Sequence, residues 1–311
     1  MSDPEPREFD GFSPAHLDAF AAHKRASHRF GLERMRTHEA LGALEGTLAP
    51  RLAAFTEGYA WRRTDPAPGI FNGHCVDGLW LHVDRVGPEH DALEREAHRA
   101  VSLSDSLREP HAMHRHAVAG VRIDQDGVAA GFWAHRHAAL DLRNLSAALA
   151  DPMERARLPV VLRDLPAEAE VLLDGISCPP ARWIAGEAPA PETVSGWFSV
   201  RRAWSRQETL DLGRSIVDHL ASALPSVLSL FRFAAWSPAN DRLGLARKLR
   251  EERRERGRKA SGLEAGHRVE VTGGLLAGRQ GEVMEVDAKG RVRVRLGLLS
   301  VELDPRTLRR L

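Results

Sequence analysis

The chain has 311 residues, of which 43% are hydrophobic and 28% are charged, and its formal net charge is +1. These values are ordinary for a soluble globular protein with one large domain or two unequal ones. The two cysteines, Cys75 and Cys178, lie far apart in the sequence, so they indicate neither a disulfide framework nor a zinc-binding spacing.

The N-terminal stretch MSDPEPREFDGF is acidic and lacks an apolar core, so we expect no signal peptide. We also expect no membrane span, since no apolar run approaches the roughly 18 residues that a span requires. Together with the few cysteines, these features predict a soluble protein in a reducing compartment, the cytoplasm.

The elements predicted for the first part of the chain begin with a helix at Ser13-Pro14, where a hydroxyl N-cap precedes a proline. Apolar residues at helical spacing predict a second helix from Leu32 to Leu48. The stretch GLWLHVD reads as a strand, and the proline of PEHDALEREAHRAV predicts the start of a further helix.

Residues 116–137 carry the clearest signal of a β-hairpin. Small or apolar residues alternate with other residues on both sides of the sequence DQDG, the period-2 pattern of a sheet with one face on a core. If Gln125 and Asp126 form the loop, paired residues have numbers that sum to 251. A loop at Asp126-Gly127 would shift this pairing by two residues.

Four histidines flank this hairpin and form a candidate metal site. With the first register, His116 faces His135 and His114 faces His137, and all four lie on the face opposite Val121. That face also carries Arg122, Trp133 and two glycines, Gly120 and Gly131, which would leave room for a small ligand. Imidazoles at this spacing could bind zinc or a similar metal. The alternative is that they line a solvated sheet face, and no other cofactor is expected.

Helical spacing returns at residues 142–165, followed by short strands near 169–174 and 197–203 and an amphipathic helix over 206–221. Mixed element order with a strong hairpin predicts an α+β body with an antiparallel sheet and flanking helices. Pro238 is a candidate start for one more helix.

The segment after the body is basic. From Arg242 to Ser261 the chain has nine Lys or Arg and three Glu, and its second half has no apolar stripe. We therefore expect a basic helical linker over 241–261, or a solvated flexible arm, that binds nucleic acid weakly and without sequence preference. The candidate nucleic-acid-binding residues are Arg247, Lys248, Arg250, Arg253, Arg254, Arg256, Arg258 and Lys259.

Residues 262–311 read as five short strands separated by polar, glycine-containing turns. Valines at positions 269, 271, 283, 292 and 294 are predicted to fill the interior. Gly266, Val269, Val271, Gly274, Gly278, Gly281, Val283 and Val286 together resemble the KOW motif found in the C-terminal domain of NusG-type transcription factors and in some ribosomal proteins.

This resemblance implies a small SH3-like β-barrel that docks onto RNA, the ribosome, RNA polymerase or termination factors. NusG-type domains often place a proline and an aromatic residue in the first loop, where this chain has Leu275 and Leu276. An aliphatic tip cannot stack on a base, which favours a protein partner. The candidate partner-binding residues are Leu275, Leu276, Arg279, Arg291, Arg293 and Arg295.

The body is similar in element order to the YktB-like family of uncharacterised bacterial α+β proteins, through Phe12, Phe20, His38, Leu48 and Pro50. This likeness supports the fold and implies no mechanism.

The sequence therefore predicts a body over residues 1–240, a linker over 241–261 and a KOW module over 262–311. The leading functional hypothesis is an adaptor that docks onto the transcription or translation machinery. The alternative is a metal-dependent enzyme that uses the hairpin histidines, with the module as a localisation tag.

Overall fold

The computed structural model of the chain describes residues 8–69, 74–87, 112–163, 165–244, 262–274, 276–287, 291–297 and 299–311. The chain divides between Leu243 and Gly244 into two compact units. The first unit, called the body here, contains both helices and an antiparallel sheet, so the predicted α+β class is confirmed.

The strands of the body form one seven-stranded sheet in the order β1-β2-β3-β4-β7-β5-β6, with every neighbouring pair antiparallel. Their bounds are β1 Tyr59–Arg63, β2 Gly78–Arg85, β3 Val118–Asp124, β4 Gly127–His135, β5 Glu170–Leu173, β6 Ile176–Cys178 and β7 Trp197–Ser205.

The described helices of the body comprise two long ones and several short ones. The long helices are α2 Gly31–Arg51 and α11 Ile216–Ala234. The short α-helices are α1 Pro14–Asp18, α3 Ala53–Thr56, α6 Ala139–Ala150, α7 Pro152–Arg155, α8 Leu158–Val161, α9 Pro180–Ile184 and α10 Arg206–Leu212. Short 3-10 turns are η1 His28–Phe30, η3 Ala112–Arg115, η4 Pro191–Thr193 and η5 Gly213–Ser215.

The hairpin of β3 and β4 has the first of the two registers that the sequence left open. Val118 pairs with Trp133 and Asp124 pairs with Gly127, which leaves Gln125 and Asp126 as the two-residue loop. The predicted sum of 251 is therefore confirmed. This register places Val121, Ile123 and Phe132 on the core side of the sheet, where all three are buried.

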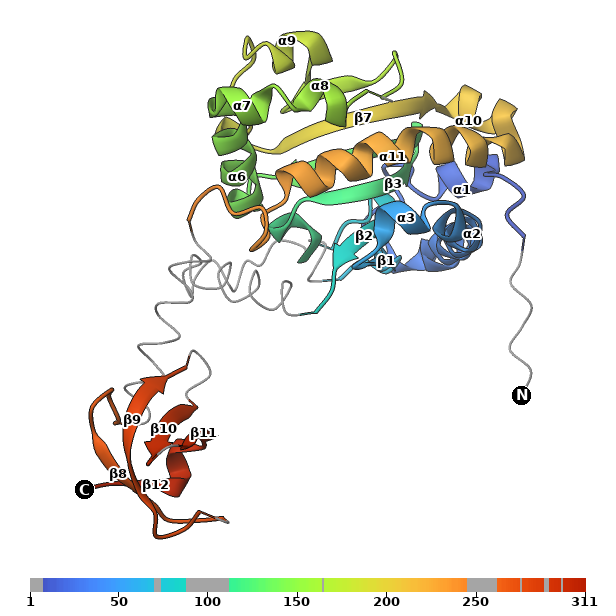
Figure 1. The fold of residues 1–311 in the computed structure, drawn as a ribbon. Helices are drawn as coiled ribbons and strands as arrows, with labels where there is room; N and C mark the ends of the chain where they lie inside the picture. Colours follow the sequence, from blue (N-terminus) through green and yellow to red (C-terminus); the bar gives the residue numbers. More distant parts are fainter. Residues whose placement is uncertain are drawn as a thin grey trace. The chain divides into compact units, whose positions relative to one another are not determined.

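The core lies between one face of the sheet and the helices. In Figure 1, α11 runs along the central strands, and α2 and α6 lie on either side of it. Val121 and Phe132 from the sheet meet Leu220, Leu224 and other residues of α11, which is apolar along most of its length. This layer excludes water from alternate residues of each strand.

Two predicted helices need comment. The predicted helix over 206–221 ends early at Leu212, and after η5 the chain continues as α11 to Ala234. Gly213, with φ of +51°, separates the two helices. The helix expected after Pro88 lies outside the described residues.

The body ends beyond the predicted boundary at residue 240. No helix begins at Pro238 in the described stretch up to Gly244. Instead, the side-chain amide of Asn240 donates hydrogen bonds to the carbonyls of Arg232, Phe233 and Ala235 at the end of α11. Arg242 then pairs with Glu154 and lies over the ring of Phe233. These contacts fix the chain to the body as far as Leu243.

Within the described parts of the chain, one helical stretch, Arg206–Ala234, has the length and apolar composition of a membrane span. Most of its apolar window, 61%, is buried inside the body. A buried core helix passes the same test, so this feature is weak evidence for a membrane segment.

The second unit holds a five-stranded antiparallel sheet in the order β11-β10-β9-β8-β12. Its strands are β8 Arg268–Val271, β9 Gln280–Val286, β10 Val292–Leu296, β11 Leu299–Leu303 and β12 Leu308–Arg310, with a 3-10 turn η6 at Pro305–Thr307. All five valines predicted for the interior are buried, and Leu263, Val286 and Leu296 complete this separate core.

Candidate functional site

The face of the body sheet that points away from the core is lined by a different set of side chains. Residues that alternate with the core positions of the strands lie on this open face. They include Trp80, Trp133 and Trp197, together with Arg122 and Arg201. Trp80 and Trp133 form a small apolar cluster with Met113, Val118 and Ala129, and Trp197 packs against it.

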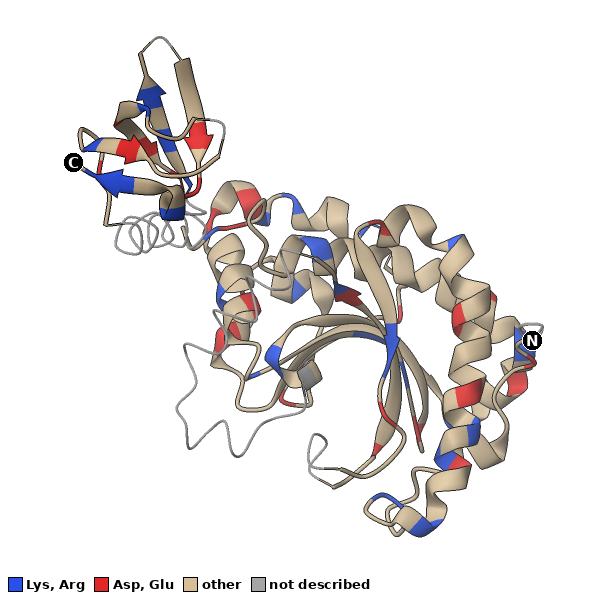
Figure 2. Cartoon of the chain, turned by 90° about the horizontal axis from the view of Figure 1, so that it is seen from below, with Lys and Arg blue, Asp and Glu red and all other residues tan. Residues whose placement is uncertain are grey.

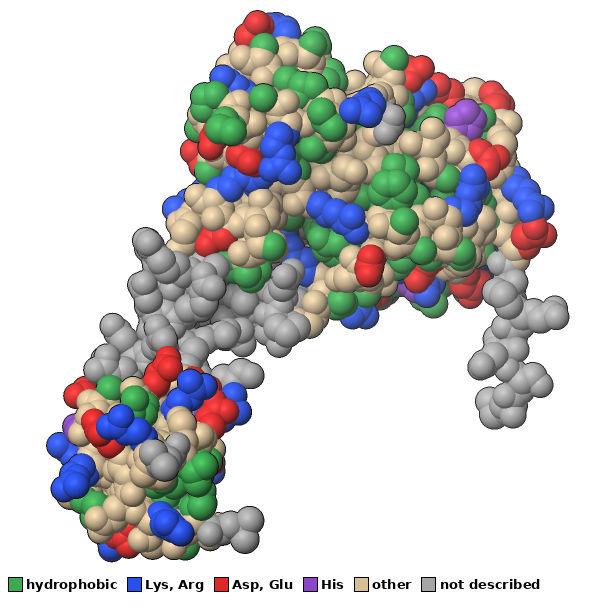
Figure 3. Space-filling view, in the orientation of Figure 1, with side chains coloured by type: hydrophobic (Ala, Val, Ile, Leu, Met, Phe, Trp, Pro, Cys, Tyr) green, Lys and Arg blue, Asp and Glu red, His purple; other side chains and the backbone are tan. Residues whose placement is uncertain are grey.

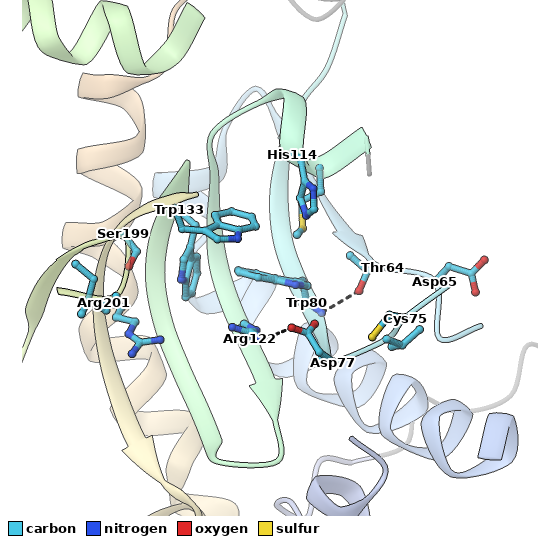
Figure 4. A pocket seen from close by; sticks show the side chains of 16 residues that line it. Thr64, Asp65, Cys75, Asp77, Trp80, His114, Arg122, Trp133, Ser199 and Arg201 are labelled. Atoms are coloured by element: carbon cyan, nitrogen blue, oxygen red, sulfur yellow. Dashed lines mark hydrogen bonds and ion pairs between the residues drawn. The ribbon is translucent and has the colours of Figure 1, made fainter. Parts of the chain in front are cut away.

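A cavity of about 480 Å³ lies on this open face. Figure 4 shows how its lining changes across the sheet. Arg201 and Ser199, from β7, lie at one side; Trp133 and Trp80 lie in the middle; Thr64, Asp65, Cys75 and Asp77 lie at the other side.

The tryptophans hold one another in fixed orientations. The rings of Trp80 and Trp133 meet edge to face with centroids 4.6 Å apart. The ring of Trp197 is stacked relative to Trp80, at 6.0 Å and an interplanar angle of 21°. Trp80 and Trp133 are buried whereas Trp197 is half-buried, so Trp197 is the most accessible indole of the three.

Glycines allow this close packing. A Cβ atom on Gly131 would lie 2.9 Å from two ring atoms of Trp133 and 2.7 Å from Cβ of Arg201. A Cβ on Gly78 would lie 3.1 Å from Nε of Arg122. The ring and the two guanidinium-bearing side chains can therefore keep their places only because these positions lack side chains.

Both arginines of the cavity have acidic neighbours. Arg122 lies over the ring of Trp80, 5.2 Å from its centroid, and its Nη2 is 3.2 Å from Asp77 and 3.4 Å from Asp124. Its buried Nε has no hydrogen-bond partner in the part of the chain that the structure describes. Arg201 donates to Glu170 at 3.1 Å. The positive charges are therefore largely balanced within the site.

The rim that carries Thr64 and Asp65 is tied to the sheet and to α2. The backbone of Trp80 donates to the Thr64 hydroxyl at 3.0 Å and accepts from the Thr64 amide. The buried guanidinium of Arg34 donates to three carbonyls, those of Lys24, Ser27 and Pro66. These bonds fix the loop that forms this rim, in which Asp65 is exposed and directs its carboxylate away from the tryptophan rings.

The four predicted histidines lie at one end of this face but not in the predicted pairs. Strand β3 begins only at Val118, and His114 lies in η3, so the predicted strand pairs His116–His135 and His114–His137 do not form. Instead His114 stacks on His135 at 4.5 Å, and His135 lies 4.7 Å from His137. His116 is buried.

The His135 imidazole is held neutral. Burial, followed by the neighbouring His137 and Arg136, lowers the pKa of His135 to about 4. Its Nδ1 accepts a hydrogen bond from the backbone amide of His137 at 3.3 Å, so the proton resides on Nε2. In this structure the hydrogen bond occupies the Nδ1 lone pair.

Among the residues that the structure describes, no group of three or more His, Cys, Asp or Glu side chains is arranged to hold a metal ion. The histidines contact one another and Trp197 through their rings, at 5.0 Å for His114 and 4.9 Å for His135. The described residues therefore do not support the predicted zinc site, which would need three or more such side chains around one point.

The C-terminal unit carries the other candidate residues. Arg293 and Arg295 are exposed on β10, between buried Val292, Val294 and Leu296, and Arg291 is exposed just before the strand. Acidic side chains accompany them: Arg291 pairs with Glu302, and Arg295 pairs with Glu282. Figure 2 shows both signs of charge on the strands of this sheet. The basic strand is therefore partly neutralised.

The loop leucines differ from the prediction. Leu276 is half-buried and packs against the core of its own unit, so it is not the freely exposed loop tip that the sequence suggested. The flanking glycines Gly274 and Gly278, with φ of +80° each, turn the loop back onto the sheet. Arg279 is exposed, and Leu275 lies outside the described residues.

All eight predicted nucleic-acid-binding residues, from Arg247 to Lys259, also lie outside the described residues. Sequence reasoning placed Arg122, Trp133 and the glycines on the open face, but it missed Trp80, Trp197 and Arg201. The alternation of core and non-core residues along β2 and β7 could have shown which face of the sheet these three side chains occupy. No sequence signal shows that β7 lies beside β4.

The chain thus has two units: an α+β body with a tryptophan-lined cavity, and a separate unit with a five-stranded sheet. No protein-family model matches it, and no curated protein is similar to it in sequence.

Proposed function

We propose that this protein is an accessory protein of the cytoplasm that docks onto the transcription or translation machinery through its C-terminal unit. In this proposal the five-stranded sheet is a small SH3-like barrel of the KOW kind, and the basic segment before it adds attraction to phosphates. The body is the part that docking brings to the machinery.

The observation that carries the proposal is that residues from Leu263 onward have a sheet and a hydrophobic core of their own. Such a unit can bind a partner without rearrangement of the body. Its surface offers apolar anchors beside charged groups: Met284 is 44% exposed and Leu299 is 62% exposed. Figure 3 shows hydrophobic side chains next to both signs of charge on the visible face of this unit.

The first test is an affinity pull-down with the full chain and with a chain that lacks residues 262–311. We expect identified ribosomal proteins, ribosomal RNA or RNA polymerase subunits to be recovered with the full chain only. Recovery that is equal for both chains would contradict docking through the C-terminal unit.

A single substitution, Leu299→Asp, locates the contact. Leu299 is exposed, so the free energy of unfolding should change by no more than about 0.5 kcal/mol. If Leu299 is an anchor, partner recovery should fall about tenfold, as expected for the loss of an interface hot spot. Ile176→Asp, at a 74% exposed position of the body, is the matched control and should leave recovery unchanged.

Leu276→Asp should behave differently, because Leu276 packs on the core of the C-terminal unit. A charge there would lose apolar burial and require desolvation, so we expect unfolding of the C-terminal unit to become easier by about 1–3 kcal/mol. Urea denaturation, followed by circular dichroism of residues 262–311, measures this difference.

A further inference from the structure

The cavity on the open face of the body sheet is independent of the docking unit. Its volume of about 480 Å³ lies within the range of roughly 300–1,000 Å³ that is typical of small-molecule sites. It is lined by aromatic rings and by a small number of fixed polar groups, which is the usual composition of such sites.

The aromatic wall favours a flat ring as ligand. Trp197 is half-buried, and contacts with Trp80, His114 and His135 hold its ring in place. A planar ligand can stack on a pre-positioned indole without first ordering it, so little conformational entropy is lost on binding. An aliphatic ligand would gain no such contact.

The polar groups change character from one side of the cavity to the other. Arg201 and Ser199 offer N–H and O–H donors on the β7 side, whereas Asp77, next to Arg122, offers a carboxylate acceptor away from β7. A complementary ligand therefore has acceptors on one edge and donors on the other. Nucleobases are flat rings that carry both acceptors (ring nitrogens and carbonyls) and donors (amino and ring N–H groups), so they can meet both kinds of group.

The charge balance argues against a highly charged ligand. Arg201 is paired with Glu170, and Arg122 is paired with Asp77 and Asp124. A triphosphate would meet these carboxylates as like charges and would be repelled. A neutral or singly phosphorylated ligand would meet no such penalty at the aromatic wall.

We propose that this cavity binds a nucleobase, stacked on Trp197 between the donors of β7 and the carboxylate of Asp77. The base could belong to a free nucleoside or nucleotide, or to an unpaired position of single-stranded RNA, in which bases are commonly recognised by stacking and by their edges. The proposed site uses residues of the body alone, so its test does not depend on whether the C-terminal unit docks onto a partner.

The test titrates the full chain with adenosine, uridine and AMP, with a short single-stranded RNA, and with ribose 5-phosphate, which lacks a ring base. Binding is measured by calorimetry and by the indole N–H signals of the seven tryptophans. We expect saturable binding of at least one base-bearing probe, with the signals of Trp80, Trp133 and Trp197 shifting most.

Trp197→Ala and Trp61→Ala form a matched pair of variants. Both tryptophans are half-buried, but Trp61 packs against the core on the other face of the sheet. Trp197→Ala should weaken binding about tenfold or more, as expected for a lost stacking partner, whereas Trp61→Ala should leave it unchanged.

The two cysteines provide an independent readout. Cys75 lines the cavity and is exposed, whereas Cys178 lies outside it. A bound base should slow the alkylation of Cys75 and leave that of Cys178 unchanged.

Each outcome decides the proposal. Binding of RNA that depends on Trp197, without binding of nucleosides or AMP, supports a base pocket and identifies RNA as the source. Binding of nucleosides or AMP that depends on Trp197 identifies a free ligand. Absence of Trp197-dependent binding for every base-bearing probe at millimolar concentration overturns the proposal, as does equal binding of ribose 5-phosphate and AMP.

Discussion

The two faces of the body sheet are built from alternate residues of the same strands, and they differ in kind. On one face Phe198 and Val200 of β7 are buried beneath helices. On the other, Trp197, Ser199 and Arg201 of the same strand surround a cavity. The comparison teaches that a single strand can supply both the fold and the site, because its side chains alternate.

Mutations on the two faces should therefore have different effects, one on stability and the other on binding. Changes on the helix-covered face should lower the free energy of unfolding and leave any binding by the folded fraction intact. Changes on the open face should do the reverse, unless they disturb the packing of the tryptophans.

The largest expected effect is on the helix-covered side, at Asp141. Its carboxylate accepts from Arg85 at 2.9 Å and from the backbone amides of Ala117 and Trp236 at 2.7 Å each. Asp141→Ala leaves the buried Arg85 charge without this partner, which typically costs about 3–5 kcal/mol. Urea denaturation measures the loss.

The control for this variant is a pair of similar chemistry at the surface. Asp218 pairs with Arg51 at 2.8 Å but is 73% exposed, so Asp218→Ala should cost no more than about 1 kcal/mol. Equal losses for the two variants would mean that burial does not determine the value of the ion pair.

A smaller effect is expected at Gly131 on the open face. Gly131→Ala would place a methyl group against Trp133 and Arg201, at the distances given above, and should cost about 1–3 kcal/mol through overpacking. Gly46→Ala is its control: it lies within α2 with no atom near the new Cβ, so it should stabilise the body by roughly 0.5–1 kcal/mol. A neutral result at Gly131 would show that the indole ring is free to move.

The smallest expected effect is the pH response of His135. Its pKa of about 4 lies below the ordinary value of 6.5, so the fold favours the neutral imidazole. That stabilisation is complete above about pH 6.5 and is lost as the pH falls toward 4. Burial is the main cause, and the neighbouring His137 and Arg136 add to the ring's preference for neutrality. The His114 ring stacks on it.

Thermal melting between pH 4.5 and pH 7 tests this response. His135→Gln should lose less stability on acidification than the unaltered chain, whereas His28→Gln, at an exposed position, should follow the unaltered chain. Parallel curves for all three proteins would contradict the assignment to His135.

Local patterns were sufficient for much of the fold. Alternation predicted which residues of β3 and β4 face the core, but it left two registers open, because a two-residue slip keeps every side chain on its face. The structure has the register with Gln125 and Asp126 as the loop. The valines of the C-terminal core followed from the same period of two. The strand β1 was missed, because its sequence YAWRR has too few alternating apolar residues to be recognised.

The site was only half predictable for a physical reason. Sequence alternation gives the face on which Arg122 and Trp133 lie, but strand order is a tertiary property. β7 pairs with β4 across an interval that contains α6, β5 and β6, so Trp197 and Arg201 could not be assigned to the same cavity. The predicted histidine pairs did not form because β3 begins only at Val118. His116 therefore precedes the strand, and His114 lies in η3.

The most direct test of the division between faces compares two neighbouring residues of β7. Trp197 lies on the open face, and Phe198 is fully buried on the other. The measurement is the dissociation constant of the best base-bearing probe for Trp197→Ala and Phe198→Ala, taken on folded protein below the melting temperature of each. The account predicts at least tenfold weaker binding for Trp197→Ala and a nearly unchanged constant for Phe198→Ala, despite a stability loss of about 3–5 kcal/mol. Equal weakening by both substitutions, or by neither, would contradict it.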